Sequence, residues 1–275
     1  MQPEQTAMLS RHFLTSVFAL ATMAAAQPAM AQSGSGGNDR VFIIGGGAAY
    51  RPEYKGADDY EVQPFPYFSV RYPISGMTLS LQGAALKLEV LASDTFSAGP
   101  LISYQQGRDD DITNPVVRQL STIDGAVEGG GYLDFETPIG PGSFSAGVIA
   151  LSDLSGVHEG YSVALNAGYR MPVTSKLSVG VGAEVKWADE NYMQTYYGVD
   201  LPGAFASGLP SYAAEAGLEK AGVNVNLIYQ LTERWGVGVF GGYDKLLDSA
   251  ADSPIVVQEG SPDQYTGALA VFYRF

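Results

Sequence analysis

Few residues in this sequence have the types and spacing that chemistry requires. His158 lies close to Ser152, Asp153, Ser155 and Glu159 along the chain. A serine, a histidine and a carboxylate can form a nucleophilic triad, but a triad is defined by geometry, which spacing alone does not supply. Because isolated histidines are common as polar residues of surface loops, we expect no catalytic residue here and no enzymatic activity.

Three consecutive carboxylates, Asp109, Asp110 and Asp111, are weak candidates for a divalent-cation site. Carboxylate oxygens suit Ca²⁺ and Mg²⁺, but the run lacks the EF-hand spacing and its glycine. A solvated acidic loop is therefore the favoured interpretation. The glycines of 45–47 do not form a phosphate-binding loop, because no helix follows and Lys55 is not at the required spacing. The sequence predicts no cofactor.

The overall composition excludes several classes of protein. The 275 residues contain 15 Lys and Arg against 29 Asp and Glu, a net charge of −14, and no cysteine. Without cysteine there can be no disulfide framework and no thiolate metal site. The acidic balance argues against a nucleic-acid partner, because phosphates are neutralised by Lys and Arg. With 46% hydrophobic residues, the chain is not expected to be disordered.

The first 31 residues have the pattern of a cleaved signal peptide. Arg11 precedes a 14-residue apolar run over 13–26, and Ala29-Met30-Ala31 follows it. That run is shorter than the roughly 20 residues of a membrane-spanning helix, and an A-x-A site is typical of secretory cleavage. We expect export, with 1–31 removed, 32–38 as a flexible segment and 39–275 as the folded domain.

Long segments of the predicted folded domain alternate between apolar and small or polar residues. The alternation is clearest over 161–171, 176–188, 222–231 and 265–275. Such a period of two predicts strands, and segments of about 10–13 residues match a tilted bilayer crossing better than an ordinary globular strand. Aromatic residues lie near the segment ends, as in the interfacial girdles of membrane barrels: Tyr161, Tyr169, Trp187, Tyr229, Trp235, Tyr243, Tyr265 and Tyr273.

These features favour an all-β protein, a transmembrane antiparallel β-barrel of up-and-down topology, over a soluble sandwich. In hydrocarbon every backbone polar group must be paired, so the sheet must close. Arg170, Glu184, Lys186 and Asn226 would then face the lumen. The last segment stops on Phe275, and with Tyr273 it resembles the terminal strand that outer-membrane barrels present to the barrel assembly machinery. This places the protein in the outer membrane of a Gram-negative bacterium, in contact with lipid and lipopolysaccharide.

Connections of alternating length set the expected topology. Short turns are predicted at 91–95, 137–143, 171–175 and 231–234, and long loops at 51–64, 105–122, 152–159, 189–211 and 245–263. Short turns are periplasmic and long loops extracellular in such barrels. The number of strands is even. Turns within 72–76 and 82–84 would give twelve strands, which we favour, and ten remain if part of 65–91 lies outside the barrel. The long loops carry sixteen acidic and five basic residues, which predicts a cation-attracting outer rim.

The loop over 189–211 is unusually aromatic, with Tyr192, Tyr196, Tyr197 and Phe205. Loops of this length are usually functional or folded onto another part of the protein. Two interpretations compete: a constriction folded into the barrel mouth, or a binding surface presented outside. The first is favoured, because Phe205 and the leucines at 201 and 209 need burial.

Several motifs together resemble the MipA/OmpV family of outer-membrane proteins: Pro52–Tyr60, Gly107–Asp111, Asn191–Val199, Ala206–Tyr212, Asp252–Val256 and the terminal Tyr273-Arg274-Phe275. The resemblance implies a structural or scaffolding protein whose partners are a lytic transglycosylase and a peptidoglycan synthase. Other members are described as porin-like, as adhesins or in antibiotic response. A narrow cation-preferring pore for small solutes and a surface adhesin are therefore the alternative functions. The family supplies no catalytic residues to carry over.

Overall fold

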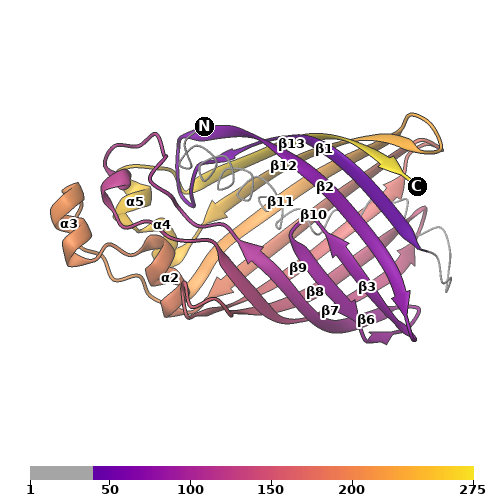
Figure 1. The fold of residues 1–275 in the computed structure, drawn as a ribbon, viewed down its shortest axis with the longest axis horizontal. Coiled ribbons are helices and arrows are strands. Elements are labelled where there is room, and N and C mark those ends of the chain that lie inside the picture. The colour runs from indigo at the N-terminus through magenta and orange to yellow at the C-terminus, as the bar shows by residue number, and fades with distance from the viewer. Residues whose placement is uncertain (1–39) are drawn as a thin grey trace, which may run out of the picture.

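The computed structural model describes residues 40–275, so the predicted signal peptide over 1–31 and the segment 32–38 lie outside the described residues. The described chain forms one antiparallel sheet whose strands follow sequence order (Figure 1). The strands are β1 (Val41–Pro52), β2 (Tyr60–Ile74), β3 (Met77–Gln82), β4 (Ala85–Glu89), β5 (Leu91–Ala92), β6 (Phe96–Gln105), β7 (Ala126–Ile139), β8 (Gly142–Asp153), β9 (Tyr161–Pro172), β10 (Leu177–Ala188), β11 (Gly217–Gln230), β12 (Trp235–Leu246) and β13 (Asp263–Arg274).

The sheet closes on itself as a barrel. β1 pairs with β13, while β4 and β5 both pair with β6. Only Val90 separates β4 from β5, so these two segments form one strand of the wall. The prediction of a twelve-stranded antiparallel barrel is confirmed. The turn between β2 and β3 has positive φ at Ser75 (49°) and Gly76 (85°), the backbone that a two-residue hairpin favours.

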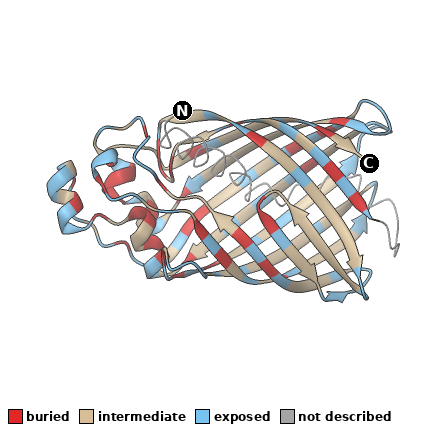
Figure 2. Ribbon diagram, in the orientation of Figure 1, coloured by how far each residue is buried: buried red, intermediate tan, exposed pale blue. Residues whose placement is uncertain are grey.

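The two faces of the wall differ as the alternation predicts. Outward residues such as Leu165, Val181 and Val223 are 52–59% exposed, which suits contact with lipid. Inward neighbours are polar or charged: Lys186 lies 3.0 Å from Glu219, and Lys220 lies 3.3 Å from Glu184. Figure 2 shows buried residues alternating with exposed ones along the strands, and further buried residues in the loops at one end.

Aromatic pairs on neighbouring strands form a girdle near each end of the barrel. At the loop end, Tyr50 stacks on Tyr60 with ring centroids 4.8 Å apart. Tyr161–Trp187 and Tyr243–Tyr265 are similar pairs at the same end. At the short-turn end, Trp235–Tyr273 and Phe96–Phe135 are both at 5.1 Å. Such girdles mark the two membrane–water interfaces of barrels.

All helices of residues 40–275 lie beyond the loop-side girdle, at the end of the barrel opposite the C-terminus (Figure 1). They are η3 (Val117–Gln119), α2 (Glu190–Tyr197), α3 (Leu201–Ser207), α4 (Asp248–Ala251) and α5 (Pro254–Val257). Within residues 40–275, none of the helices has the length and apolar character needed to cross a bilayer.

Candidate functional site

The long connections fold together over one end of the barrel. We call the segments 53–59, 106–125, 154–160, 189–216 and 247–262 the loop cap. Its first α-helix, α2, begins where the carboxylate of Asp189 accepts the backbone N–H of Tyr192 at 3.1 Å. This is an ordinary N-cap, which satisfies one of the unpaired donors of the first turn. The cap fixes the direction in which α2 leaves the barrel wall.

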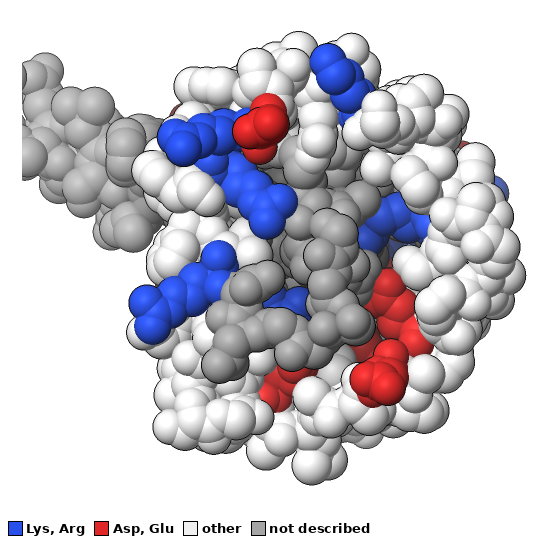
Figure 3. Space-filling model, turned by 90° about the vertical axis from the view of Figure 1, so that its right-hand side faces the viewer, with Lys and Arg blue, Asp and Glu red and all other residues white. Residues whose placement is uncertain are grey.

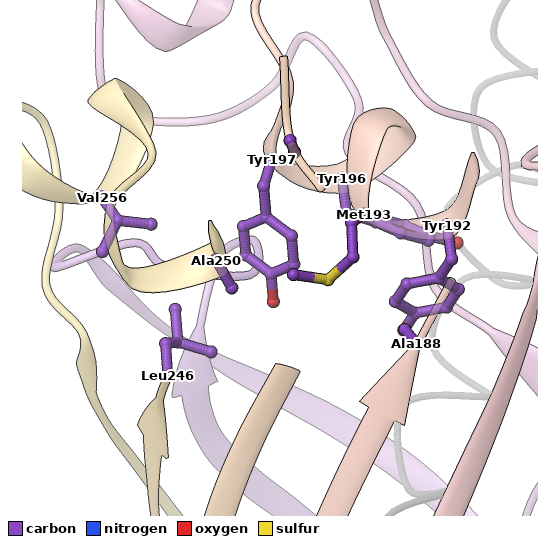
Figure 4. Packing of buried hydrophobic residues seen from close by; sticks show 9 residues of the cluster. Ala188, Tyr192, Met193, Tyr196, Tyr197, Leu246, Ala250 and Val256 are labelled. Carbon is purple, nitrogen blue, oxygen red and sulfur yellow. The ribbon is translucent and has the colours of Figure 1, made fainter. Parts of the chain in front are cut away.

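One face of α2 is the centre of an apolar cluster at the barrel mouth (Figure 4). Tyr192, Met193 and Tyr197 each have no exposed surface, and they pack with Ala188 at the end of β10. The other members come from further along the chain: Ala214, Leu246, Ala250 and Val256, together with Tyr196. The cluster ties the loop after β10 to the loop after β12.

A second cluster lies further from the membrane and joins four loops. Tyr54, Val117 and Ile255 are at most 5% exposed. They pack with Ala57, Ile112, Leu120, Val199 and Leu209. A hydrogen bond from the Ser253 hydroxyl to the Tyr197 carbonyl, at 2.6 Å, links the two clusters. The long loops are therefore packed against one another as a small core of their own.

A fully buried carboxylate lies beneath α2. Glu219 has no exposed surface, and its carboxylate lies 2.8 Å from Lys55 Nζ and 3.0 Å from Lys186 Nζ. The hydroxyls of Tyr197 and Tyr192 donate to it at 3.0 and 3.3 Å. A buried charge persists only when it is paired and hydrogen-bonded. These contacts join the loop after β1, strands β10 and β11, and helix α2 around one group.

Burial sets the acid–base behaviour of the cap residues around this carboxylate. Removal from water raises the pKa of Tyr192 and of Tyr197 well above the usual value, and the Glu219 charge raises both further. Burial also lowers the pKa of Lys55, although attraction to Glu219 opposes that shift. Arg108 is buried as well, which lowers its pKa to about 10 and leaves it cationic at neutral pH.

His158 is buried, contrary to the expectation of a solvated loop residue. Its side chain makes an edge contact with Tyr192 at 5.0 Å, and the residue is 2% exposed. The backbone N–H of Gly160 donates to Nδ1 at 3.1 Å, so the ring proton lies on Nε2. That atom faces Glu128 Oε1 at 3.2 Å. The histidine is a packed and paired part of the cap.

The other residues of the possible triad do not meet the histidine side chain. The Asp153 carboxylate accepts the backbone N–H groups of Ser155, His158 and Glu159 at 2.7–2.9 Å, which shapes the loop after β8. Ser152 Oγ donates to the Gly160 carbonyl at 3.4 Å. Neither Ser152 nor Ser155 is hydrogen-bonded to the His158 ring, so the structure assembles no triad from these residues.

The acidic run does not gather into a metal site. Asp109, Asp110 and Asp111 are exposed, and the Asp109 carboxylate accepts the backbone N–H of Asp111 at 3.0 Å. Among residues 40–275, no three His, Cys, Asp or Glu side chains are arranged to hold a metal ion. The run belongs to the acidic outer surface of the cap.

The aromatic loop divides into a buried part and an exposed part. Tyr192, Tyr196 and Tyr197 are at most 3% exposed, and Leu209 is 4% exposed. Phe205 is 97% exposed, and Leu201 is 76% exposed, so the expectation that both are buried is wrong. Both belong to α3, which projects away from the barrel (Figure 1), because its contacts with the rest of the cap run through Gly203 and Ala204.

The C-terminal residues lie in the girdle at the short-turn end. Tyr273 accepts a hydrogen bond from Arg234 at 2.9 Å, and its ring is 5.0 Å from that of Phe275. The backbone N–H of Phe275 donates to the Phe42 carbonyl at 3.0 Å. The terminal aromatic residue thus stands on the lipid face beside the β1–β13 junction.

The sequence alone does not reveal the central residue of the site, Glu219, and the reason is structural. Lys186 pairs with Lys220, but the next residue, Trp187, pairs with Leu218. Glu219 is the extra residue of a β-bulge, which turns two consecutive side chains of β11 inward. The only trace in the sequence is the interrupted alternation before 222. Lys55 and Glu128 had no signal beyond their charge.

Solved structures share this architecture. An outer membrane channel of the COG4313 group from Pseudomonas putida F1 aligns with a TM-score of 0.51 at 11% identity, over 91% of this chain and 100% of that one. The outer membrane channel DcaP of Acinetobacter baumannii covers 86% of this chain and 96% of its own, with a TM-score of 0.42 and 10% identity. At these identities the likeness concerns the fold. No curated protein sequence matches the chain.

The family profile described as "MltA-interacting protein MipA" matches residues 44–275. This range runs from the first strand of the barrel to the C-terminal phenylalanine, and it includes every segment of the loop cap. The resemblance inferred from the motifs is thereby confirmed, and the protein, an outer-membrane β-barrel, belongs to the MipA family.

Proposed function

We propose that the protein is a closed outer-membrane barrel that holds a lytic transglycosylase at the periplasmic face of the membrane. The family is named for interaction with MltA, and MltA is such an enzyme. A peptidoglycan synthase is the second partner that the resemblance implies. The barrel would act as an anchor, with no enzymatic activity of its own. A hydrolytic activity lost in His158→Ala would contradict that last point.

The observation that carries the proposal is the packing of the loop cap around Glu219. The long loops bury two apolar clusters and a carboxylate with no exposed surface at the barrel mouth. Loops committed to such a core are poorly suited to conducting solutes through that end. A structural role at the opposite, periplasmic end is the function that this arrangement leaves open.

The periplasmic end offers a limited but defined surface. It consists of the turns 75–76, 93–95, 140–141, 173–176 and 231–234, with basic and acidic side chains among mainly uncharged residues (Figure 3). A standard interface covers about 800 Å² per partner. The partner would therefore contact several turns at once, together with the barrel rim between them.

Co-purification from mild-detergent extracts tests the proposal. The tagged barrel is expected to retain a lytic transglycosylase after brief crosslinking. Lys176→Glu combined with Arg234→Glu, in two periplasmic turns, should weaken that retention. Arg118→Glu is the matched control, an exposed basic residue of the loop cap. Failure of the unmodified barrel to retain the enzyme, or equal loss in the control, would reject the anchoring role.

A narrow cation-preferring pore is the second candidate, favoured by the acidic outer surface of the cap. Exposed acids there include Asp58, Asp110, Glu190 and Asp252, whereas Arg108 is buried. A rim of negative charges raises the local concentration of cations. The structural neighbour from P. putida is titled a channel. If the anchor proposal holds, planar bilayers containing the folded protein stay electrically silent, and steady cation conductance would favour the pore.

A further inference from the structure

One stretch of the barrel wall has a neighbouring strand on one side only. β2 has fifteen residues, and β1 pairs with it from Tyr60 to Arg71. On its other side, β3 pairs with it only from Ser69 to Ile74. Among the described strands no other lies against β2. Figure 1 shows the β3–β4 hairpin ending part-way along the wall, while β2 and β6 continue toward the loop cap.

On the opposite side of this stretch, strand β6 also has few paired residues. β4 meets β6 through only two residue pairs, Leu86↔Ile102 and Lys87↔Leu101. We call the interruption between residues 60–67 of β2 and 103–105 of β6 the wall gap. The hairpin turn at 83–84 bounds it on the periplasmic side.

Hydrogen bonds close the gap at its outer end. Arg51 of β1 donates to Glu61 at 2.7 Å and also to Gln106, which directly follows β6. The Thr113 hydroxyl donates to Glu53 at 2.6 Å, so the loops after β1 and β6 are tied together. The gap is therefore a bounded window in the backbone ladder of the barrel and does not split the wall along its whole length.

The window lies at the depth of the hydrocarbon. Tyr60 belongs to the loop-side girdle, and Val62 and Phe68 follow it toward the membrane centre, 68% and 45% exposed on the outer face. An open strand edge is costly in lipid, because its N–H and C=O groups have no water to bind. The residues at this edge should therefore show how the cost is reduced.

Prolines occupy two of the β2 positions whose backbone groups face the gap, where an N–H group would otherwise lack a partner strand. The Phe68 carbonyl accepts the Gly83 N–H, so residue 68 directs its backbone groups toward the gap, and residues 66 and 64 do the same because the strand period is two. Both are proline. On β6 the Ala98 carbonyl accepts the Val90 N–H, and Pro100, which has the same parity, lies next to the gap on the side of β4.

These prolines also restrict what can occupy the gap. Proline cannot donate to a ladder and is characteristic of permanent edges. An added peptide strand would lack these partners, so strand addition is disfavoured. An occupant that needs no backbone hydrogen bonds is favoured instead.

The interior near the gap combines polar side chains such as Gln63 and Ser103 with apolar patches that are unusual for the lumen of such barrels. Phe65 and Leu101 face inward and are 5% and 3% exposed. Leu101 packs with Ala85 and Tyr132, and this cluster continues onto β8 through two further apolar side chains: Ile149 and Leu151. A path through the gap would thus lead from the acyl chains of the outer leaflet to apolar surface inside.

We propose that the wall gap is a lateral portal, through which a straight acyl chain passes from the outer leaflet and lies against Phe65, Leu101 and Tyr132 inside the barrel. The chain can belong to a membrane lipid or to a free fatty acid, since both present the same unbranched hydrocarbon. This portal is independent of the periplasmic anchoring role, and either can fail without the other.

Photocrosslinking of the unmodified protein tests the portal. The barrel is refolded into phosphatidylcholine vesicles that contain a fatty acid with a diazirine in its chain, and a second sample carries the diazirine in the phospholipid acyl chain. After irradiation, adducts are expected on the inward residues Phe65, Leu101 or Tyr132. Interior adducts in the first sample alone indicate a free fatty acid, and adducts in the second indicate a membrane lipid. Adducts confined to outward residues such as Val62 and Val239 in both samples would overturn the portal.

A blocking variant supplies the second test. Ala85→Trp places a bulky ring on the inner side of the hairpin, against Leu101 and Tyr132, and should reduce interior adducts several-fold. Ala167→Trp, on the lipid face of β9, is the matched control and should leave them unchanged. Heat-shift electrophoresis checks that each variant folds. Undiminished interior labelling in folded Ala85→Trp would mean that the probe uses another path, against the portal; if that variant does not fold, the unmodified barrel alone decides.

Discussion

Among single residues, Glu219 has four polar partners to lose, two lysines and two tyrosines. Replacing it with glutamine leaves Lys55 and Lys186 buried beside a neutral group. Removing one partner of a buried ion pair typically costs about 3–5 kcal/mol, so the free energy of unfolding should fall by an amount of that order. Urea titrations followed by tryptophan fluorescence measure the change. Glu215→Gln, an exposed cap residue, should leave the midpoint unchanged.

A double variant tests whether Glu219 stabilises the fold through its charge or through its packing. Lys55→Met added to Glu219→Gln removes one of the two stranded cations, and it should recover part of the lost stability, because residues that share a network are not additive. Strictly additive losses would show that the ion pair is not what Glu219 contributes.

The buried phenols predict a pH dependence. Burial raises the pKa of four cap tyrosines: Tyr54, Tyr192, Tyr196 and Tyr197. The unfolded chain loses these protons at about pH 10, while the folded chain keeps them. The folded state then binds more protons, so the free energy of unfolding decreases as the pH rises above that value. Below it, these groups have no effect on pH dependence.

Ultraviolet absorbance of the phenolate measures this difference. In the folded barrel a fraction of the tyrosine signal should appear only well above pH 10, and in urea all of it should appear near that value. Tyr197→Phe should reduce the late fraction. A single titration shared by the folded and unfolded protein would contradict the inferred burial.

Among the elements, the closing pair β1–β13 depends on Gly47 of β1. A Cβ at Gly47 would lie 2.1 Å from the Leu269 carbonyl oxygen, whereas one at Gly46 would lie 3.5 Å from its nearest neighbour, the Phe65 oxygen. Gly47→Ala should therefore destabilise the barrel by about 1–3 kcal/mol, as overpacking does, and slow its closure. Gly46→Ala is the matched control one residue away.

The folded fraction after dilution from urea, read from gel mobility, compares the two glycine variants. We expect Gly47→Ala to refold in lower yield than both the unmodified protein and Gly46→Ala. Similar yields for both variants would show that the wall relaxes around the added methyl group.

The elements also show where sequence reasoning succeeds. Alternation located the strands around 161–188 because each has one face toward lipid and one toward the lumen, so that polarity changes at every second residue. The same rule cannot find Glu219, since a bulge abolishes the period locally. The turns predicted within 72–76 and 82–84 indicated the short β3, because alternation alone does not distinguish a six-residue strand from a full crossing.

Tertiary packing within the loop cap limited prediction there. An aromatic loop indicated burial for Tyr192 and Phe205 alike, but burial depends on which face of a short helix meets its neighbours. α2 turns its tyrosines onto the barrel mouth, while α3 packs through small residues and leaves Phe205 in water. His158 shows the converse, a polar residue buried because Glu128 and Gly160 satisfy its nitrogens.

For the whole molecule, the decisive question is whether the loop cap closes the barrel. Deleting residues 190–214 removes α2 and α3 together with the tyrosines around Glu219. We expect this deletion to raise the conductance of the barrel in planar bilayers well above that of the unmodified protein. Deleting α3 alone, residues 201–207, should leave the barrel silent, because that helix projects away from the mouth.

Ion selectivity of the opened barrel follows from the remaining charge. The chain carries a net charge of −14, and the deletion removes only two acids, Glu190 and Asp200. The reversal potential in a potassium chloride gradient should therefore indicate a preference for potassium, which weakens at high salt as the rim charges are screened. A deletion that folds yet stays silent would show that the obstruction lies in the barrel itself. Equal conductance in both deletions would show that α3 takes part in closure.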